Sequence, residues 1–172
     1  MKKRNAMLLI VLLFIVASLS CAPAVDDQTA KNKEVVMQAI DVLNNHEYEK
    51  LDQLYAQDFK RYCQATPEAV VESLDDFKTL LAEWDKQFPD AYNELHMIAA
   101  DSDLVAFYMT YSGTQEGQMG PFPPTGKKMS LECAGFHRLE NGKIVETWVT
   151  WDNLAALAQL GHFPPPSEEA DK

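Results

Sequence analysis

The chain has 172 residues, which is enough for about one domain, and its 47% hydrophobic and 24% charged residues are typical of a globular protein. The formal net charge is −11; the first 20 residues hold three of the 15 basic residues and no acidic residue, so the remaining 12 basic and 26 acidic residues give −14. Since such an acidic surface repels nucleic acid and anionic membranes, we expect neither as a partner of the folded domain.

The N-terminus has the pattern of an export signal. Basic residues at positions 2–4 precede an apolar run over 6–17, which is too short to cross a bilayer comfortably. Small residues then lead to Cys21, as in bacterial lipoprotein signals, where the cysteine receives lipid and becomes the first residue of the mature protein. Cleavage after Ala24 is the alternative, so the sequence leaves two mature ends open.

This pattern divides the chain into four parts. Residues 1–20 are predicted to be the signal peptide, 21–32 a polar tether, 33–163 the folded domain and 164–172 a disordered tail that begins with three prolines. The domain is expected outside the cytoplasm, in the cell envelope, and attached to a membrane only through the lipid on Cys21.

Helices are predicted in the first half of the domain. Apolar residues recur at helical spacing over 33–45 and again over 47–59. A third helix is expected to start at Thr66-Pro67, a capping hydroxyl followed by proline at the first turn, and to run to Phe88.

Strands dominate the second half of the domain. Segments rich in β-branched and aromatic residues, separated by turn residues, predict strands, a loop that rims an opening and a short helix. In chain order these are strands over 92–100 and 104–114, the loop over 115–127, strands over 129–139 and 143–152, and a helix over 153–160. Helices followed by a mostly antiparallel sheet predict an α+β fold, with the helices on one face of a curved sheet and a pocket inside.

The Asn141-Gly142 pair predicts a two-residue hairpin turn, which sets the pairing of the last two strands. Counting outward from the turn, His137 is predicted to lie opposite Glu146. Because side chains alternate along a strand, the residues of every second pair share one face. That face is predicted to hold His137, Gly135, Cys133, Leu131, Glu146, Trp148, Thr150 and Asp152.

A histidine and carboxylates on a partly apolar face are groups that proton transfer uses. We predict Asp152 as the acid/base group, with its pKa raised by burial beside Trp148. His137 is predicted to orient that acid or to polarise a carbonyl, and Glu146 to hold the imidazole. Two simpler interpretations stay open: His137 and Glu146 form a cross-strand ion pair, and Asp152 caps the helix that follows.

The remaining candidate residues are aromatic, polar or sulfur-bearing. Cys63 and Cys133 can form a disulfide in an oxidising compartment or can be two small buried side chains, and neither has the spacing of a metal ligand, so we expect no metal. Of the neighbours Phe107 and Tyr108, only one can face inward. The predicted ligand-binding residues are Trp148, Thr150, Tyr108 and Trp84.

Three segments of the chain resemble those of a known family. They are FPD at 88–90, GTQEG at 113–117 with PTG at 124–126, and GKIVETWVTWD at 142–152 with AQLG at 158–161. In this order and spacing they resemble the SnoaL-like polyketide cyclases, also called ester cyclases, of the NTF2-like superfamily. The likeness covers roughly residues 35–161. The chain departs from it after Asp58-Phe59, where many relatives carry a histidine and this chain has KRY at 60–62.

The resemblance implies a cone-shaped α+β barrel with a largely apolar pocket, dimerisation through the outer face of the sheet, and closure of an aromatic ring by aldol condensation without cofactor or metal. It implies an acid/base role for Asp152 and a partner role for His137. Two hypotheses follow. The protein is either a cofactor-free cyclase- or isomerase-like enzyme for a small apolar carbonyl compound, or a non-catalytic module of the cell envelope that binds a small molecule or a protein partner.

Overall fold

The computed structural model describes residues 27–163. The predicted signal peptide, the predicted lipidation site Cys21, residues 21–26 of the tether and the tail over 164–172 lie outside the described residues, so export and lipidation stay predictions. Within the described part of the chain, no helix is long and apolar enough to cross a membrane.

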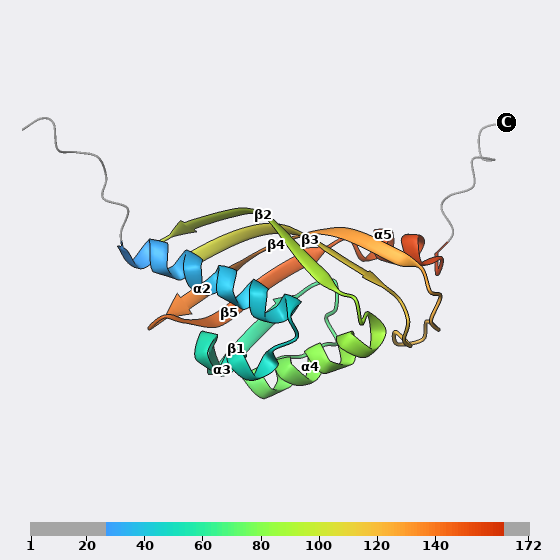
Figure 1. Ribbon diagram of the computed structural model, residues 1–172, viewed down its shortest axis with the longest axis horizontal. Helices are drawn as coiled ribbons and strands as arrows, with labels where there is room; N and C mark the ends of the chain where they lie inside the picture. Colours follow the sequence, from blue (N-terminus) through green and yellow to red (C-terminus); the bar gives the residue numbers. More distant parts are fainter. Residues whose placement is uncertain (1–26, 164–172) are drawn as a thin grey trace, which may run out of the picture.

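The order of elements follows the predicted change from helices to strands, with one exception near the start (Figure 1). In chain order the elements are α2 Asp27–Asn44, the 3₁₀ turn η1 Tyr48–Lys50, α3 Leu51–Leu54, β1 Tyr55–Cys63, α4 Leu74–Gln87, β2 Tyr92–Asp101, β3 Leu104–Thr114, β4 Lys128–Glu140, β5 Lys143–Trp151 and α5 Asn153–Leu160. The limits of β3 and α5 are those predicted.

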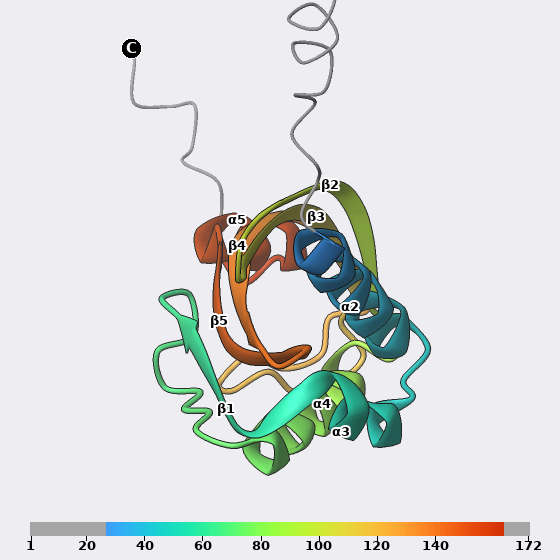
Figure 2. The ribbon, with the colours of Figure 1, turned by 90° about the vertical axis from the view of Figure 1, so that its left-hand side faces the viewer.

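The strands form one curved sheet in the order β1-β5-β4-β3-β2. Neighbouring strands are antiparallel except for β1, which runs parallel to β5. Figure 2 shows the strands bending around the interior, with α2 on one side and α3 and α4 at the open end of the curve. The predicted α+β fold is confirmed, and the sheet is mixed rather than purely antiparallel.

The predicted helix over 47–59 is wrong in its second half. The helical part ends at Leu54, and the chain continues as β1 with Tyr55, Phe59 and Arg61 buried. A spacing of four residues fits one face of a helix and also one face of a strand, so Tyr55 and Phe59 satisfy both periods. Pairing with β5 decides the outcome, and the first strand of the sheet was therefore missed.

The predicted starts of two helices are also corrected. Residues 27–32, which were assigned to the tether, belong to α2, and the buried Asn32 donates through Nδ2 to the Ser102 carbonyl at 2.9 Å. The helix expected from Thr66 begins only at Leu74. Its cap is Ser73, whose Oγ accepts the Asp76 amide at 3.1 Å, which is the usual N-cap bond.

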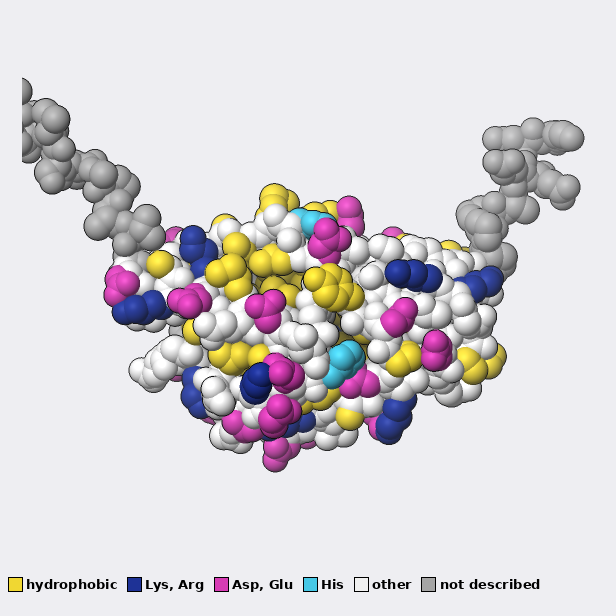
Figure 3. Space-filling view, viewed as in Figure 1, with side chains coloured by type: hydrophobic (Ala, Val, Ile, Leu, Met, Phe, Trp, Pro, Cys, Tyr) yellow, Lys and Arg dark blue, Asp and Glu magenta, His cyan; other side chains and the backbone are white. Residues whose placement is uncertain are grey.

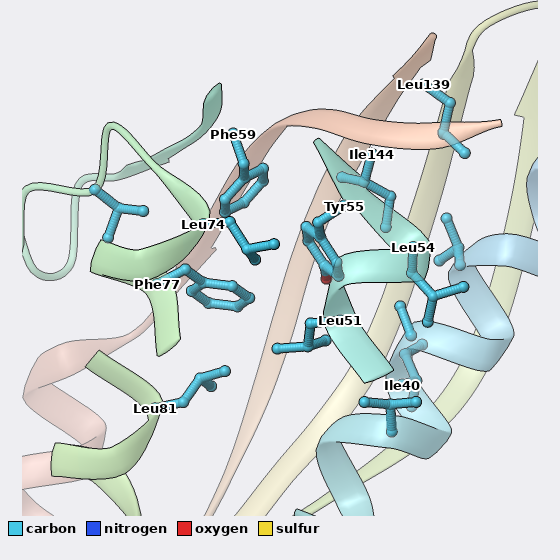
Figure 4. Packing of buried hydrophobic residues seen from close by; sticks show 14 of the residues in the cluster. Ile40, Leu51, Leu54, Tyr55, Phe59, Leu74, Phe77, Leu81, Leu139 and Ile144 are labelled. Carbon is cyan, nitrogen blue, oxygen red and sulfur yellow. The ribbon is translucent and has the colours of Figure 1, made fainter. Parts of the chain in front are cut away.

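The main hydrophobic core lies where α2, α3, β1 and α4 meet one end of the sheet. Figure 4 shows buried side chains from these elements pointing toward one another around Phe59. The Phe59 ring contacts Tyr55 edge-on at 4.9 Å between centroids and Phe77 at 5.1 Å. A smaller cluster around Phe88, Leu131 and Leu160 holds the other end. The space between these two clusters is the site described next.

Candidate ligand-binding cavity

A cavity of about 360 Å³ lies between the concave face of the sheet and the helices α2 and α4. This volume is at the small end of the range for ligand pockets. Its lining is mostly aromatic and aliphatic, and the loop between β3 and β4 adds Met119 and Gly120, as expected for a loop at a rim. Figure 3 shows one side of the molecular surface, where hydrophobic side chains are visible near the middle among scattered acidic ones.

A β-bulge changes the predicted pairing of the last hairpin. The turn pairs Glu140 with Lys143 and Leu139 with Ile144, as predicted, but Arg138 then pairs with Glu146. Residue 145 is the extra residue on β5, so every later residue of β5 is moved by one position. Because side chains alternate with a period of two, a shift of one residue exchanges the two faces of the strand.

The predicted catalytic face is therefore not formed. His137 lies opposite Thr147, and the inward side of β5 carries Thr147, Val149 and Trp151. Glu146, Trp148 and Thr150, which were predicted to face the pocket, lie on the other side of the sheet and do not line the cavity.

His137 itself is where the prediction placed it, on the cavity side of β4. It is 7% exposed, its Nδ1 lies 2.7 Å from Thr147 Oγ1, and its ring stacks on Phe107 at 4.8 Å. Burial lowers the His137 pKa to about 3, because the charged imidazolium loses its hydration. The side chain is consequently neutral near pH 7, able to exchange a hydrogen bond but a weak base.

Glu146 and Trp148 lie on the outer face of the sheet, where Trp148 is part of a row of aromatic side chains. The Trp148 ring stacks between Tyr62 at 5.1 Å and Phe136 at 5.0 Å, with the Arg138 guanidinium 5.5 Å from its centroid. Arg138 also pairs with Glu146 at 3.3 Å, in place of the predicted pair of His137 with Glu146. The homodimer implied by the resemblance stays a prediction, and this row lies on the outer face of the sheet through which it is expected to form.

Of the other two predicted ligand contacts, only Trp84 faces the cavity. Tyr108 faces outward and contacts His96, while its neighbour Phe107 lines the cavity. Trp84, on α4, lines the cavity as predicted. Its role in ligand binding stays a prediction.

Asp152 caps helix α5, which is the simpler of the two roles predicted for it. It is exposed, its Oδ1 accepts the Ala155 amide at 3.0 Å, and it stands at the N-cap of α5. Among the described residues that line the cavity, its neighbours Trp151 and Asn153 are present and Asp152 is not. The proposed proton-transfer pair of Asp152 and His137 is therefore not assembled.

Replacing Asp152 with alanine is expected to lower the free energy of unfolding by about 1 kcal/mol, because an N-cap bond is lost. Asp152→Asn keeps a capping oxygen and is expected to change that free energy by a few tenths of a kcal/mol at most. Urea unfolding of both variants, with ligand affinity measured in parallel, checks this. A large loss of ligand affinity in Asp152→Asn, at unchanged stability, would show that Asp152 takes part in ligand binding.

Arg61 is the cavity residue that the sequence did not single out. It projects from β1 beside Phe59 and is 7% exposed. Its guanidinium carbon lies 5.1 Å from the Trp84 ring and 5.7 Å from the Trp151 ring. Burial lowers its pKa, yet arginine stays charged in proteins. The departure from the family pattern after Asp58-Phe59 was a signal that could have identified Arg61. Arg61 lies in that segment, which is part of a strand, and its side chain faces inward.

A hydrogen-bonded group of polar side chains lies at another part of the cavity wall. The Tyr48 hydroxyl donates to Asp85 Oδ1 at 2.7 Å, and His46 Nδ1 lies 3.0 Å from the same oxygen. All three residues line the cavity. Burial, and then the bond to Asp85, raise the Tyr48 pKa, so the phenol remains protonated. Asp85 is thus a carboxylate that lines the cavity and is held in place by two partners.

Cys63 and Cys133 are free thiols. Because β5 lies between β1 and β4, strand spacing puts the two Cα atoms about 10 Å apart, which is more than the ~7 Å that a disulfide spans. Burial raises the Cys133 pKa to about 11, so this thiol is neutral near pH 7. Of the two interpretations left open by the sequence, that of small buried side chains holds for Cys133, whereas Cys63 is only partly buried.

The chain is similar to known proteins in sequence and in fold. The family of SnoaL-like polyketide cyclases matches residues 33–160. Among solved structures, IdmH, a candidate polyketide cyclase from Streptomyces antibioticus, is 25% identical over 76% of this chain and 98% of its own, with a TM-score of 0.68. AclR, a candidate hydroxylase from Streptomyces galilaeus, is 26% identical over 81% and 87%, with a TM-score of 0.70.

A SnoaL-like protein from Jannaschia species CCS1 shares the fold at 18% identity, with a TM-score of 0.74 over 84% of this chain and all of the other. The chain matches no curated protein.

Proposed function

Since this chain belongs to the SnoaL-like polyketide cyclase family, we propose that its cavity binds a small, largely apolar carbonyl compound. The observation that carries the proposal is a cavity of about 360 Å³ whose walls are mostly apolar, with the neutral His137 among its polar groups. Apolar walls provide the affinity, and a few polar groups orient the ligand. The fold alone does not select a reaction, because one fold hosts many activities.

Catalysis is the second candidate function, and one observation favours it. Asp85 lines the cavity as a carboxylate already held by Tyr48 and His46. Removal of a proton beside a carbonyl needs a base, and Thr147, Val149 and Trp151 on the inward side of β5 supply none. In this alternative Asp85 accepts the proton, and Asp152 has no part in the reaction.

The first experiment is native mass spectrometry of the protein purified from its own source, followed by extraction and identification of any retained molecule. We expect a small compound with a ring or short chain and a carbonyl group. A long-chain lipid, or a protein that takes up no added aromatic carbonyl compound, neither a ketone nor an acid, would contradict the proposal.

Two neighbouring substitutions on β5 form a matched pair for this experiment. Val149→Phe fills the cavity from its wall and is expected to abolish retention of the compound. Thr150→Phe adds the same ring on the outer face and is expected to leave retention unchanged. Equal loss in both variants would show that the compound lies elsewhere.

A further inference from the structure

Arg61 is a buried cation without a carboxylate partner. No ion pair joins it to an acidic residue in the described part of the chain. Its Nη1 lies 3.4 Å from Thr66 Oγ1, a long contact, and its Nη2 is buried with no hydrogen-bond partner. The Cys63 side chain is a further polar contact. A guanidinium carries five N–H donors, so most of its bonding capacity is unused.

Such an arrangement is costly for the folded protein. Burial of a charge without a counter-ion is unfavourable, and the cation–π contacts with the Trp84 and Trp151 rings offset only part of that cost. The carboxylates that line the cavity, Glu68 and Asp85, are not within ion-pair distance of Arg61. The neutral Cys133 thiol supplies no counter-charge either.

A ligand in the cavity can supply the missing negative charge. A planar guanidinium matches the two oxygens of a carboxylate or of a phosphate, and both pair with it through two parallel hydrogen bonds. The apolar walls and the single cation favour a group with one negative charge, because the second charge of a phosphate would be left unpaired in an apolar site. The two indole rings beside the guanidinium line the same cavity and can contact the body of the ligand.

We propose that Arg61, flanked by Trp84 and Trp151, is a carboxylate subsite, and that the cavity selects small aromatic or alicyclic acids over neutral compounds of the same size. This inference rests on the proposed binding function and specifies the ligand class. Arg61 pairs with the carboxylate, the rings of Trp84 and Trp151 contact the apolar part, and His137 on β4 offers a neutral hydrogen-bonding partner to a ring oxygen.

The test uses two probes that share a ring system, 2-naphthoate and 2-acetylnaphthalene, titrated calorimetrically into the purified protein at pH 7. We expect the acid to bind about 10-fold or more tighter than the ketone. Arg61→Met is expected to weaken binding of the acid by about 10- to 100-fold, the factor for a hydrogen bond to a charged group, and to change binding of the ketone by about twofold at most. Arg61→Lys keeps the charge without the planar fork and should fall between them.

Arg138→Met is the matched control, because Arg138 also lies over a tryptophan but on the outer face. It should leave both affinities unchanged. Equal affinity of the wild type for acid and ketone, or an unchanged affinity of Arg61→Met for the acid, would overturn the carboxylate subsite while leaving the binding function intact. Binding of neither probe would overturn both.

The stability of the ligand-free Arg61→Met variant separates recognition from a structural role. Removal of an unpaired buried charge is expected to leave the urea midpoint unchanged or to raise it. A clearly lower midpoint would show that the contacts with Trp84 and Trp151 hold the fold together, which would contradict the proposal.

Discussion

Replacing Phe59 with alanine is expected to lower the free energy of unfolding by about 3–5 kcal/mol, among the largest effects of any single substitution in this chain. The Phe59 side chain is 0% exposed and lies where β1, α4 and the cavity meet (Figure 4). The substitution removes apolar area from the core together with two aromatic contacts, to Tyr55 and Phe77, each worth about 0.5–1.5 kcal/mol beyond burial.

Urea unfolding followed by circular dichroism measures this loss for Phe59→Ala. Lys60→Ala is the control, since the next residue of the same strand is exposed and its replacement should change the free energy by about 0.5 kcal/mol at most. A loss below about 1 kcal/mol in Phe59→Ala would mean that β1 does not bury its inward face as described.

Acid is expected to destabilise the protein through His137. In the unfolded chain this histidine takes up a proton near its ordinary pKa of 6.5, whereas burial keeps it neutral in the folded chain down to about pH 3. Between these values the unfolded state binds more protons, so the free energy of unfolding falls with decreasing pH, by about 1.4 kcal/mol for each pH unit. Above pH 6.5 this contribution to stability is fully present, and by pH 3 it is lost.

The comparison of wild type with His137→Gln isolates this residue from the carboxylates, which titrate in both proteins. Glutamine can keep a bond to Thr147 and does not take up a proton, so the wild type should lose stability relative to the variant as the pH falls from 6.5 toward 4. His96→Gln, at an exposed position, should run parallel to wild type. Parallel curves for His137→Gln would show that His137 is not buried as a neutral group.

Much of the fold could be predicted from local patterns. The β-branched and aromatic residues of β3 and the Asn141-Gly142 turn predict strands and a hairpin without help from distant parts of the chain, and the α5 boundaries follow from Asp152 as cap and Gly161 in the left-handed region with φ 82°. The family, too, was identified from short segments, and the match over residues 33–160 confirms it.

The content of the cavity could not be predicted in this way, because it depends on contacts between segments that are distant in the sequence. One extra residue in β5, at position 145, exchanges the faces of the strand, so that Val149 enters the cavity and Glu146 leaves it. A bulge of this kind has no strong local signal, since it is selected by how the whole sheet curves over the helices.

Arg61 shows the same dependence most clearly. Its spacing of two residues from Phe59 fits one face of a strand and not one face of a helix, and parallel pairing with β5, about 80 residues later in the chain, turns it inward between Trp84 and Trp151. Local propensity decides which residues form strands β2 to β5, whereas β1 depends on its pairing with β5. Which side chains meet inside the cone is decided by the register between strands, and that register is a property of the folded sheet.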